Sequence, residues 1–169
     1  MGPRENEEMT GFRIEPASEA DVPLILRMIK ALADYERLAD QVVATEAGLR
    51  EALFGERRYG EVVLGYAGTD AVGFALFFHN FSTFRGAPGI YLEDLFVDPR
   101  WRGRGLGRRL LAHVAAVAVA RGCHRMEWSV LDWNESAVAF YRRAGARPLD
   151  DWTMFRVTGD ALLALAETR

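Results

Sequence analysis

The sequence has a single cysteine, no long apolar run and little net charge, and each shortage excludes a class of protein. Cys123 alone can form neither an internal disulfide nor a cysteine-based zinc site. No apolar run approaches the ~20 residues of a membrane span, and residues 1–10 are polar and charged, unlike a signal peptide. A net charge of −3 gives no overall attraction to nucleic acid. We therefore expect a cytoplasmic protein with no nucleic-acid or membrane partner.

Metal and nucleotide-binding motifs are also missing. His79, His113 and His124 lack the spacing of metal ligands, so we predict no metal site. The nucleoside triphosphate loop requires Gly-Lys-Ser/Thr, whereas Gly107 is followed by two arginines. The dinucleotide fingerprint G-x-G-x-x-G does not fit either, because the glycines here are spaced G-x-G-x-G.

What the sequence does contain is a strand-like apolar run at residues 90–97, then a loop with Gly103, Gly105 and Gly107, then a helical pattern that begins near Arg108. Glycine lets the backbone approach a ligand closely. The free N–H groups at the start of a helix attract anions. This order of strand, glycine loop and helix predicts a phosphate-binding site.

The remaining patterns predict a mixed α/β fold of the α+β type. A length of 169 residues suits one domain, which we place at residues 12–169 after a flexible N-terminus at residues 1–11. Apolar and β-branched runs predict strands at residues 12–16, 61–67, 71–79, 90–97, 125–131 and 152–157. Helical spacing and cap signals predict helices at residues 21–35, 45–54, 108–121, 134–144 and 160–166, and residues 81–89 are expected to form a loop. This order differs from the regular alternation of a Rossmann unit.

The motif Arg102-x-x-Gly105-x-Gly107 after a bent strand resembles the pyrophosphate-binding motif of the GNAT acetyltransferases. The likeness covers about residues 12–167, and within the family the chain resembles the spermidine/spermine and thialysine acetyltransferase group. Further matching segments are, in chain order, Ile29-Lys30, Tyr35-Glu36, Tyr91-Leu92-Glu93-Asp94, Trp133-Asn134-Glu135 and Phe140-Tyr141. The resemblance implies the GNAT fold, a central and mostly antiparallel sheet with a splayed parallel strand pair and helices on both faces. It also implies a homodimer and acetyl-CoA as the acetyl donor.

In the family, backbone groups of the central strand and of the glycine loop hold the donor. Carried over to this sequence, the oxyanion contact falls on a backbone N–H near Leu95, and the pantetheine contacts fall on Phe96 and Val97. Three arginine side chains would supplement the loop amides at the phosphates, namely Arg102, Arg104 and Arg108. The other cofactor-binding positions that the resemblance implies are Gly103, Gly105, Leu106, Gly107, Asn134, Ser136, Ala137 and Tyr141.

Acetyl transfer to an amine needs a base, because an alkylammonium with a pKa near ~10.4 must lose a proton before it attacks. Alternation places one set of side chains on one face of the central strand, namely Tyr91, Glu93, Leu95 and Val97, and a second set on the opposite face, namely Leu92, Asp94 and Phe96. Glu93 is the proposed base, since an acid on an apolar strand is costly without a purpose and the family glutamate lies near the amine. The alternative for Glu93 is a structural salt bridge to an arginine, which is the preferred interpretation of Asp94.

Transfer also needs an acid for the departing thiolate, and Tyr141 is the proposed group. A tyrosine at the matching position of the family protonates the sulfur of coenzyme A, and Asn134 lies seven residues earlier, as in the family. The alternative is a core aromatic beside Phe140. Asn134 can also be a helix N-cap, which is compatible with a cofactor contact.

Besides Glu93, the resemblance implies four acceptor-contacting residues, namely Tyr35, Glu36, Trp128 and Asp150. The acids among them form either a pocket for a cationic amine or ordinary surface charge. The loop at residues 81–86 and the few acids before Trp152 differ from the polyamine enzymes. We therefore predict an N-acetyltransferase that moves acetyl directly to a primary amine of a diamine, a polyamine or a lysine-like amino acid. A protein or peptide N-acetyltransferase and a non-catalytic acyl-CoA-binding module remain alternatives.

Overall fold

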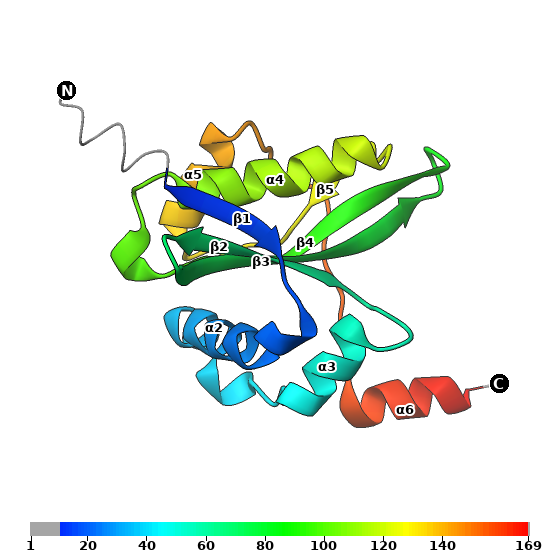
Figure 1. The fold of residues 1–169 in the computed structure, drawn as a ribbon. Helices are drawn as coiled ribbons and strands as arrows, with labels where there is room; N and C mark the ends of the chain where they lie inside the picture. The colour runs from blue at the N-terminus through cyan, green and yellow to red at the C-terminus, as the bar shows by residue number, and fades with distance from the viewer. Residues whose placement is uncertain (1–10, 169) are drawn as a thin grey trace. The chain divides into compact units, whose positions relative to one another are not determined.

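Figure 1 shows the computed structural model of the chain, which describes residues 11–168. These residues fall into two compact units, residues 11–131 and residues 132–168. Of the flexible N-terminus predicted at residues 1–11, all but Gly11 lies outside the described residues. The assignment of residues 12–169 to one domain stays a prediction.

Residues 11–131 are built on a five-stranded sheet. Its strands lie in chain order, β1 (Phe12–Pro16), β2 (Glu61–Ala67), β3 (Asp70–Ser82), β4 (Ala87–Val97) and β5 (Met126–Glu127). The pairs from β1 to β4 are antiparallel, whereas β4 and β5 are parallel. The predicted mostly antiparallel sheet with one parallel pair is therefore confirmed.

Helices cover both faces of this sheet, with α4 (Leu106–Ala120) on one face and α2 (Val22–Tyr35) and α3 (Glu46–Phe54) on the other (Figure 1). The apolar stripe of α2 buries Ile25 and Met28 in a cluster with Phe74 and Phe96 of the sheet. Short 3-10 turns precede these helices or connect them to the sheet, at Glu19–Asp21, Ala39–Gln41 and Pro99–Trp101. The helix that the sequence predicts from Thr45 begins as expected, because the Thr45 hydroxyl accepts a hydrogen bond of 3.1 Å from the Gly48 N–H.

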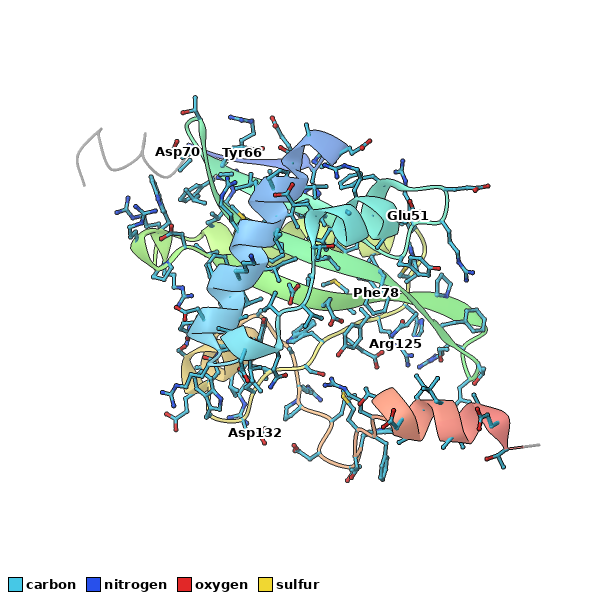
Figure 2. All side chains as sticks on the ribbon, turned by 90° about the horizontal axis from the view of Figure 1, so that it is seen from below. Glu51, Tyr66, Asp70, Phe78, Arg125 and Asp132 are labelled. Carbon is cyan, nitrogen blue, oxygen red and sulfur yellow. The ribbon has the colours of Figure 1, made fainter. Side chains whose placement is uncertain are left out.

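The arm formed by β3 and β4 is longer than predicted. The ladder continues to Ser82 opposite Ala87, so residues 81–89 are mostly strand, and the turn is confined to residues 83–86. Pro88 is compatible with a strand at a position whose N–H does not donate to the ladder. Figure 2 labels Phe78 of β3, which pairs with Tyr91 of β4.

One predicted strand is shorter than expected, and another does not form. The strand predicted at residues 125–131 is limited to Met126–Glu127, because the pairing of β5 with β4 ends there. Residues 152–157 form no strand, because among residues 11–168 they have no neighbouring strand that would satisfy their backbone groups. The second unit instead contains two helices, α5 (Glu135–Arg143) and α6 (Gly159–Glu167).

Candidate active site

A β-bulge places the proposed base on the central strand. Leu76 and Phe77 are consecutive on β3, yet they pair with Asp94 and Leu92 on β4, so Glu93 is the extra residue of the ladder. Neighbouring residues of β3 face opposite sides, and therefore Leu92 and Asp94 also face opposite sides. The predicted strict alternation along this strand is wrong, because the bulge resets it at Glu93. The Glu93 side chain is exposed and is accessible to an acceptor.

Glu36, Glu93 and Asp94 form an acid group on the first unit. Burial, and to a smaller extent the negative charges of Glu93 and Glu36, raise the pKa of Asp94 to about 6. Burial also raises the pKa of Glu36, at the C-terminal end of α2. Within residues 11–168 no arginine or lysine forms an ion pair with Asp94, so the salt bridge expected for it is not present. The acid group thus carries negative charge that no cation of the described chain neutralises by direct pairing.

Beside the acid group, the parallel strand pair opens. β5 pairs with β4 only at Ile90 and Tyr91, so residues 92–97 of β4 have no strand partner on that side within the described chain. We call this segment the open edge. It includes Leu95, Phe96 and Val97, the three residues predicted to contact the donor through their backbones. Unpaired backbone N–H and C=O groups at such an edge can accept an added strand or an extended ligand.

The glycine loop follows the open edge. Gly103 and Gly105 have φ of 77° and 90°, which side chains rarely adopt, and a Cβ at either position would meet no atom within 4 Å. The first helical hydrogen bond of α4 runs from the Arg109 N–H to the Gly105 carbonyl, over 3.1 Å. α4 therefore begins at Leu106, earlier than predicted, and its first N–H groups point out of the helix start. The loop and this helix start can together hold an anion.

Core packing fixes the position of the loop. The Leu106 side chain is only 1% exposed, so this residue can offer a ligand only its backbone N–H. Gly65 makes room for it, because a Cβ there would lie 3.0 Å from Leu106, and Gly73 lets the backbone of β4 approach, because a Cβ there would lie 2.7 Å from the Phe96 carbonyl. The loop is thus tied through Leu106 to the sheet whose strand β4 carries the open edge.

The predicted phosphate-binding arginines differ in their contacts. The Arg102 Nε–H donates to the Val97 carbonyl over 2.9 Å, and its guanidinium lies 4.1 Å from the Tyr35 ring centroid. Arg104 lies over the Trp101 ring, at 4.8 Å. The side chain of Arg108 is exposed on the first turn of α4. The sequence did not indicate the aromatic contacts, because they join residues that are distant along the chain or lie within a turn.

Trp128 directly follows β5 and is half-buried, within the same unit as the acid group. One residue further, the Ser129 hydroxyl lies 2.8 Å from the Tyr91 hydroxyl, so a side-chain hydrogen bond joins the two segments just beyond the point where strand pairing ends. Tyr91 also packs against Phe78, with ring centroids 5.3 Å apart. Sequence reasoning missed the hydrogen bond between Tyr91 and Ser129, which holds the two segments together where the parallel strand pair opens.

In the second unit, Asn134 is the N-cap of α5, as the sequence predicts. It is only 8% exposed, and its Oδ1 accepts hydrogen bonds from the Ala137 N–H at 3.3 Å and from the Ser136 hydroxyl at 3.1 Å. The Ala137 amide is therefore engaged by the cap itself. Tyr141 lies near the end of the helix, half-buried, with its ring 5.1 Å from that of Phe140. Asp150 is exposed in a turn of the same unit.

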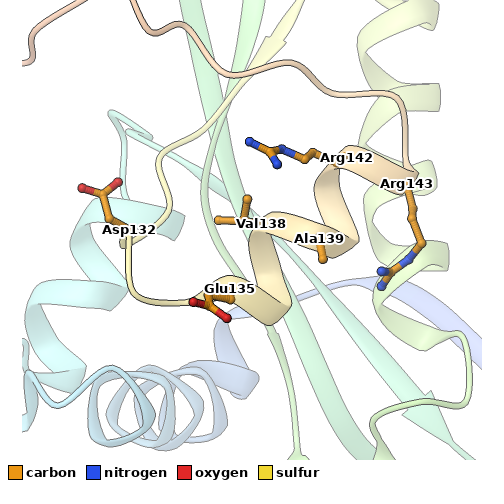
Figure 3. Close-up of a pocket in the computed structure, with 6 residues that line it drawn as sticks. All are labelled: Asp132, Glu135, Val138, Ala139, Arg142 and Arg143. Carbon is orange, nitrogen blue, oxygen red and sulfur yellow. The ribbon is translucent and has the colours of Figure 1, made fainter.

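A hollow of about 410 Å³ runs along α5 (Figure 3). Asp132 and Glu135 line it at the N-terminal end of the helix, and Arg142 and Arg143 line it at the C-terminal end. This distribution of charge complements the helix dipole, which favours acids at the first turn and bases at the last. Stabilisation of α5 explains these residues without a ligand.

The open edge, the glycine loop and the start of α4 are the segments in which the sequence predicts the donor site of an acetyltransferase. The sequence profile of the acetyltransferase (GNAT) family matches residues 27–146. The chain therefore belongs to the GNAT acetyltransferase family, whose members use acetyl-CoA as the acetyl donor. With curated relatives that are N-acetyltransferases, this membership makes the chain an N-acetyltransferase.

Among its relatives, a thialysine N-epsilon-acetyltransferase from Sus scrofa is 40% identical, over 94% of this chain and 99% of the relative. An L-ornithine N5-acetyltransferase from Arabidopsis thaliana is 33% identical, over 90% of this chain and 87% of the relative. A solved structure of an integron cassette protein from the mobile metagenome of V. cholerae has a TM-score of 0.80 at 25% identity, over 94% of this chain and 99% of that one. No helix within residues 11–168 has the length and apolar character that crossing a membrane requires.

Proposed function

We propose that the protein transfers acetyl from acetyl-CoA directly to a primary amine of a small cationic acceptor. The observation that carries this proposal is the acid group beside the open edge. Burial, and then like-charge repulsion from Glu93 and Glu36, raise the pKa of Asp94, and a cation placed among the three carboxyl groups would relieve the repulsion. The names of the relatives support the same class, because thialysine and ornithine are small cationic amines.

On the donor side, the proposal assigns the phosphates to the glycine loop and the start of α4. The backbone N–H groups of Gly103, Gly105 and Gly107 and of the first turn are suited to an anion. Backbone groups of Phe96 and Val97 would align the pantetheine arm as an added strand along the open edge. The Leu95 N–H would stabilise the oxyanion that forms on the thioester carbonyl.

On the acceptor side, Glu93 is the proposed base. Directly or through one water, its carboxylate takes a proton from the acceptor ammonium, and the neutral amine then attacks the acetyl carbon. Tyr141 is the proposed acid, which gives its hydroxyl proton to the thiolate as the carbon–sulfur bond breaks. Tyr35, Glu36, Trp128 and Asp150 remain the proposed acceptor contacts. The products are an N-acetylated amine and free coenzyme A.

The proposal is tested by thiol release from acetyl-CoA between about pH 7.5 and 8.5, where a general base is ionised. The panel contains thialysine, ornithine, lysine, putrescine, spermidine and a basic peptide. We expect turnover with at least one small amine and none with the peptide. Turnover with the peptide alone would favour the protein acetyltransferase. Silence with every amine, together with acetyl-CoA binding by calorimetry, would favour the non-catalytic acyl-CoA-binding module.

We also propose that the protein is a homodimer in the cytoplasm, without a metal, nucleic-acid or membrane partner. The dimer is supported by large apolar side chains of the second unit that are 43–90% exposed, including Leu149, Trp152, Met154, Phe155, Val157, Leu162, Leu163 and Leu165. Such a dense apolar surface is characteristic of an interface. Sedimentation velocity should give a dimer that Phe155→Glu dissociates, and a monomer at every concentration would contradict it.

A further inference from the structure

Arg102 contacts β4 and α2, neither of which is part of the proposed phosphate site. Its Nε–H donates to the Val97 carbonyl at the end of β4, over 2.9 Å. Its guanidinium lies 4.1 Å from the Tyr35 ring centroid and 5.9 Å from that of Phe96. The side chain therefore joins the glycine loop to the last residue of α2.

Tyr35 is followed by Glu36, the C-cap of α2. Glu36 is one of the two carboxyl groups whose charge raises the pKa of Asp94, so its position affects the acid group directly. Backbone hydrogen bonds from the Glu36 and Leu38 N–H groups to the Leu32 and Ala33 carbonyls close the end of α2. The Arg102 guanidinium adds a side-chain contact one residue before Glu36, at a helix end where local opening is easiest.

We propose that Arg102 is a positioning residue for the acceptor, which stacks on Tyr35 to hold Glu36 in the acid group. This inference rests on the proposed function, because it assigns the acid group to the cationic amine. It differs from the phosphate role that the sequence suggests for Arg102. In this arrangement the backbone amides of the glycine loop bind the donor, whereas Arg102 of the same loop orders the residues that bind the acceptor.

The geometry depends on a planar guanidinium. Stacking on an aromatic ring and donation from Nε are both possible for arginine at once, whereas lysine has a compact ammonium without an Nε–H at that position. Arg102→Lys thus keeps the positive charge near the phosphates and removes the contact that orders α2. Arg100→Lys is a matched control, because Arg100 precedes the loop and pairs with Asp98 at 2.7 Å.

The decisive comparison is between the KM of the amine acceptor and the Kd of acetyl-CoA. For Arg102→Lys we expect the KM of the best small amine to rise about tenfold, with the acetyl-CoA Kd from calorimetry changed less than about twofold. Arg100→Lys should change neither. A weaker acetyl-CoA Kd with an unchanged amine KM would show that Arg102 is a phosphate ligand and would overturn the proposal.

Variants of Tyr35 test the contact between the Tyr35 ring and the Arg102 guanidinium. Tyr35→Phe keeps the aromatic face and should keep the amine KM, whereas Tyr35→Leu should raise it as Arg102→Lys does. Because both changes remove one contact, the double variant should be no worse than either single variant. Additive effects on the amine KM would contradict the proposed stacking role.

Hydrogen exchange separates this inference from the proposed function. Amide exchange at residues 33–37 should be faster in Arg102→Lys than in the natural protein or in Arg100→Lys. This readout needs no acceptor, so it stands even if the amine panel is silent. Unchanged exchange at the end of α2 would overturn the positioning role, whatever the enzyme acetylates.

Discussion

The two units of the chain differ in how their functional residues are held. Residues 11–131 contain every buried apolar side chain of the described chain, and the backbone of the proposed donor site is packed on them through Leu106 and Phe96. In residues 132–168 the only buried side chain is the polar Asn134, and many large apolar residues are exposed. The first unit therefore has a core of its own, whereas the helices of the second unit depend on caps and on whatever covers their apolar surface.

This difference between the units parallels the proposed roles of their residues. Phosphate and oxyanion contacts require backbone N–H groups at fixed positions, and a core supplies that rigidity. The proposed acid instead requires one hydroxyl on a short helix. A loss of packing in the first unit should therefore damage donor binding, whereas removal of the proposed acid hydroxyl in the second unit should leave donor binding intact.

The largest effect is expected for Leu106→Ala. This change leaves a cavity beneath the glycine loop, and we expect it to lower the free energy of unfolding by about 2–5 kcal/mol. Leu163→Ala is the matched control, since Leu163 is 64% exposed. It should cost less than about 0.5 kcal/mol when both changes are measured in the Phe155→Glu background, in which the proposed dimer is dissociated. Urea unfolding measures both, and equal losses would remove the contrast between the units.

A smaller effect, on turnover alone, is expected for Tyr141→Phe. Loss of a general acid should lower kcat by about a hundredfold. The acetyl-CoA Kd should stay close to that of the natural protein, because the ring and its contact with Phe140 remain. Stopped-flow or steady-state thiol release measures the first quantity and calorimetry the second. Unchanged turnover would remove Tyr141 from the acid role.

The sequence was sufficient where function depends on neighbouring residues in the chain. The glycine spacing predicted the loop, and the cap signals predicted the starts of the helices at Thr45 and Asn134, because each interaction lies within one turn. The family match then supported the same segments. The precise start of α4 was missed, since Gly105 already turns the backbone before the helical pattern of side chains begins.

The sequence was insufficient where function depends on pairing between distant segments. Alternation on β4 predicted the wrong faces, because the bulge at Glu93 is defined by the register with β3. The environment of Asp94 depends on Glu36 of a different element. For the same reason the strand predicted at residues 152–157 did not form, since an apolar run becomes a strand only beside a partner.

Asp94 gives a pH-dependent prediction within the first unit. Its pKa is about 6 in the folded protein and 3.8 without the fold, so the folded state binds more protons between these values. Stability from this group is therefore complete below about pH 4 and is lost as the pH rises through about 6. Asp94→Asn removes the loss, and it should raise the free energy of unfolding by about 3 kcal/mol at pH 8.

The same variant should have almost no effect near pH 4, where the natural side chain is already neutral in the fold. Urea unfolding at both pH values measures the difference between variant and natural protein, so that other titrating groups cancel. Glu93 and Glu36 are the charges that face Asp94, and Asp94 itself is half-buried. An equal gain at both pH values would indicate altered packing rather than relief of charge.

The smallest expected effect concerns Asn134, whose cap and proposed cofactor contact can be separated. Asn134→Ala removes the acceptor for the Ala137 N–H and should destabilise α5 by about 1 kcal/mol, seen as faster amide exchange in that helix. Asn134→Asp keeps a good cap, so exchange should stay slow. If Asn134 also contacts the donor through its amide, the aspartate variant should bind acetyl-CoA about tenfold more weakly, since the NH₂ donor is lost. Equal affinity in the aspartate variant would show that Asn134 only caps α5, and its place in the donor site would then be withdrawn.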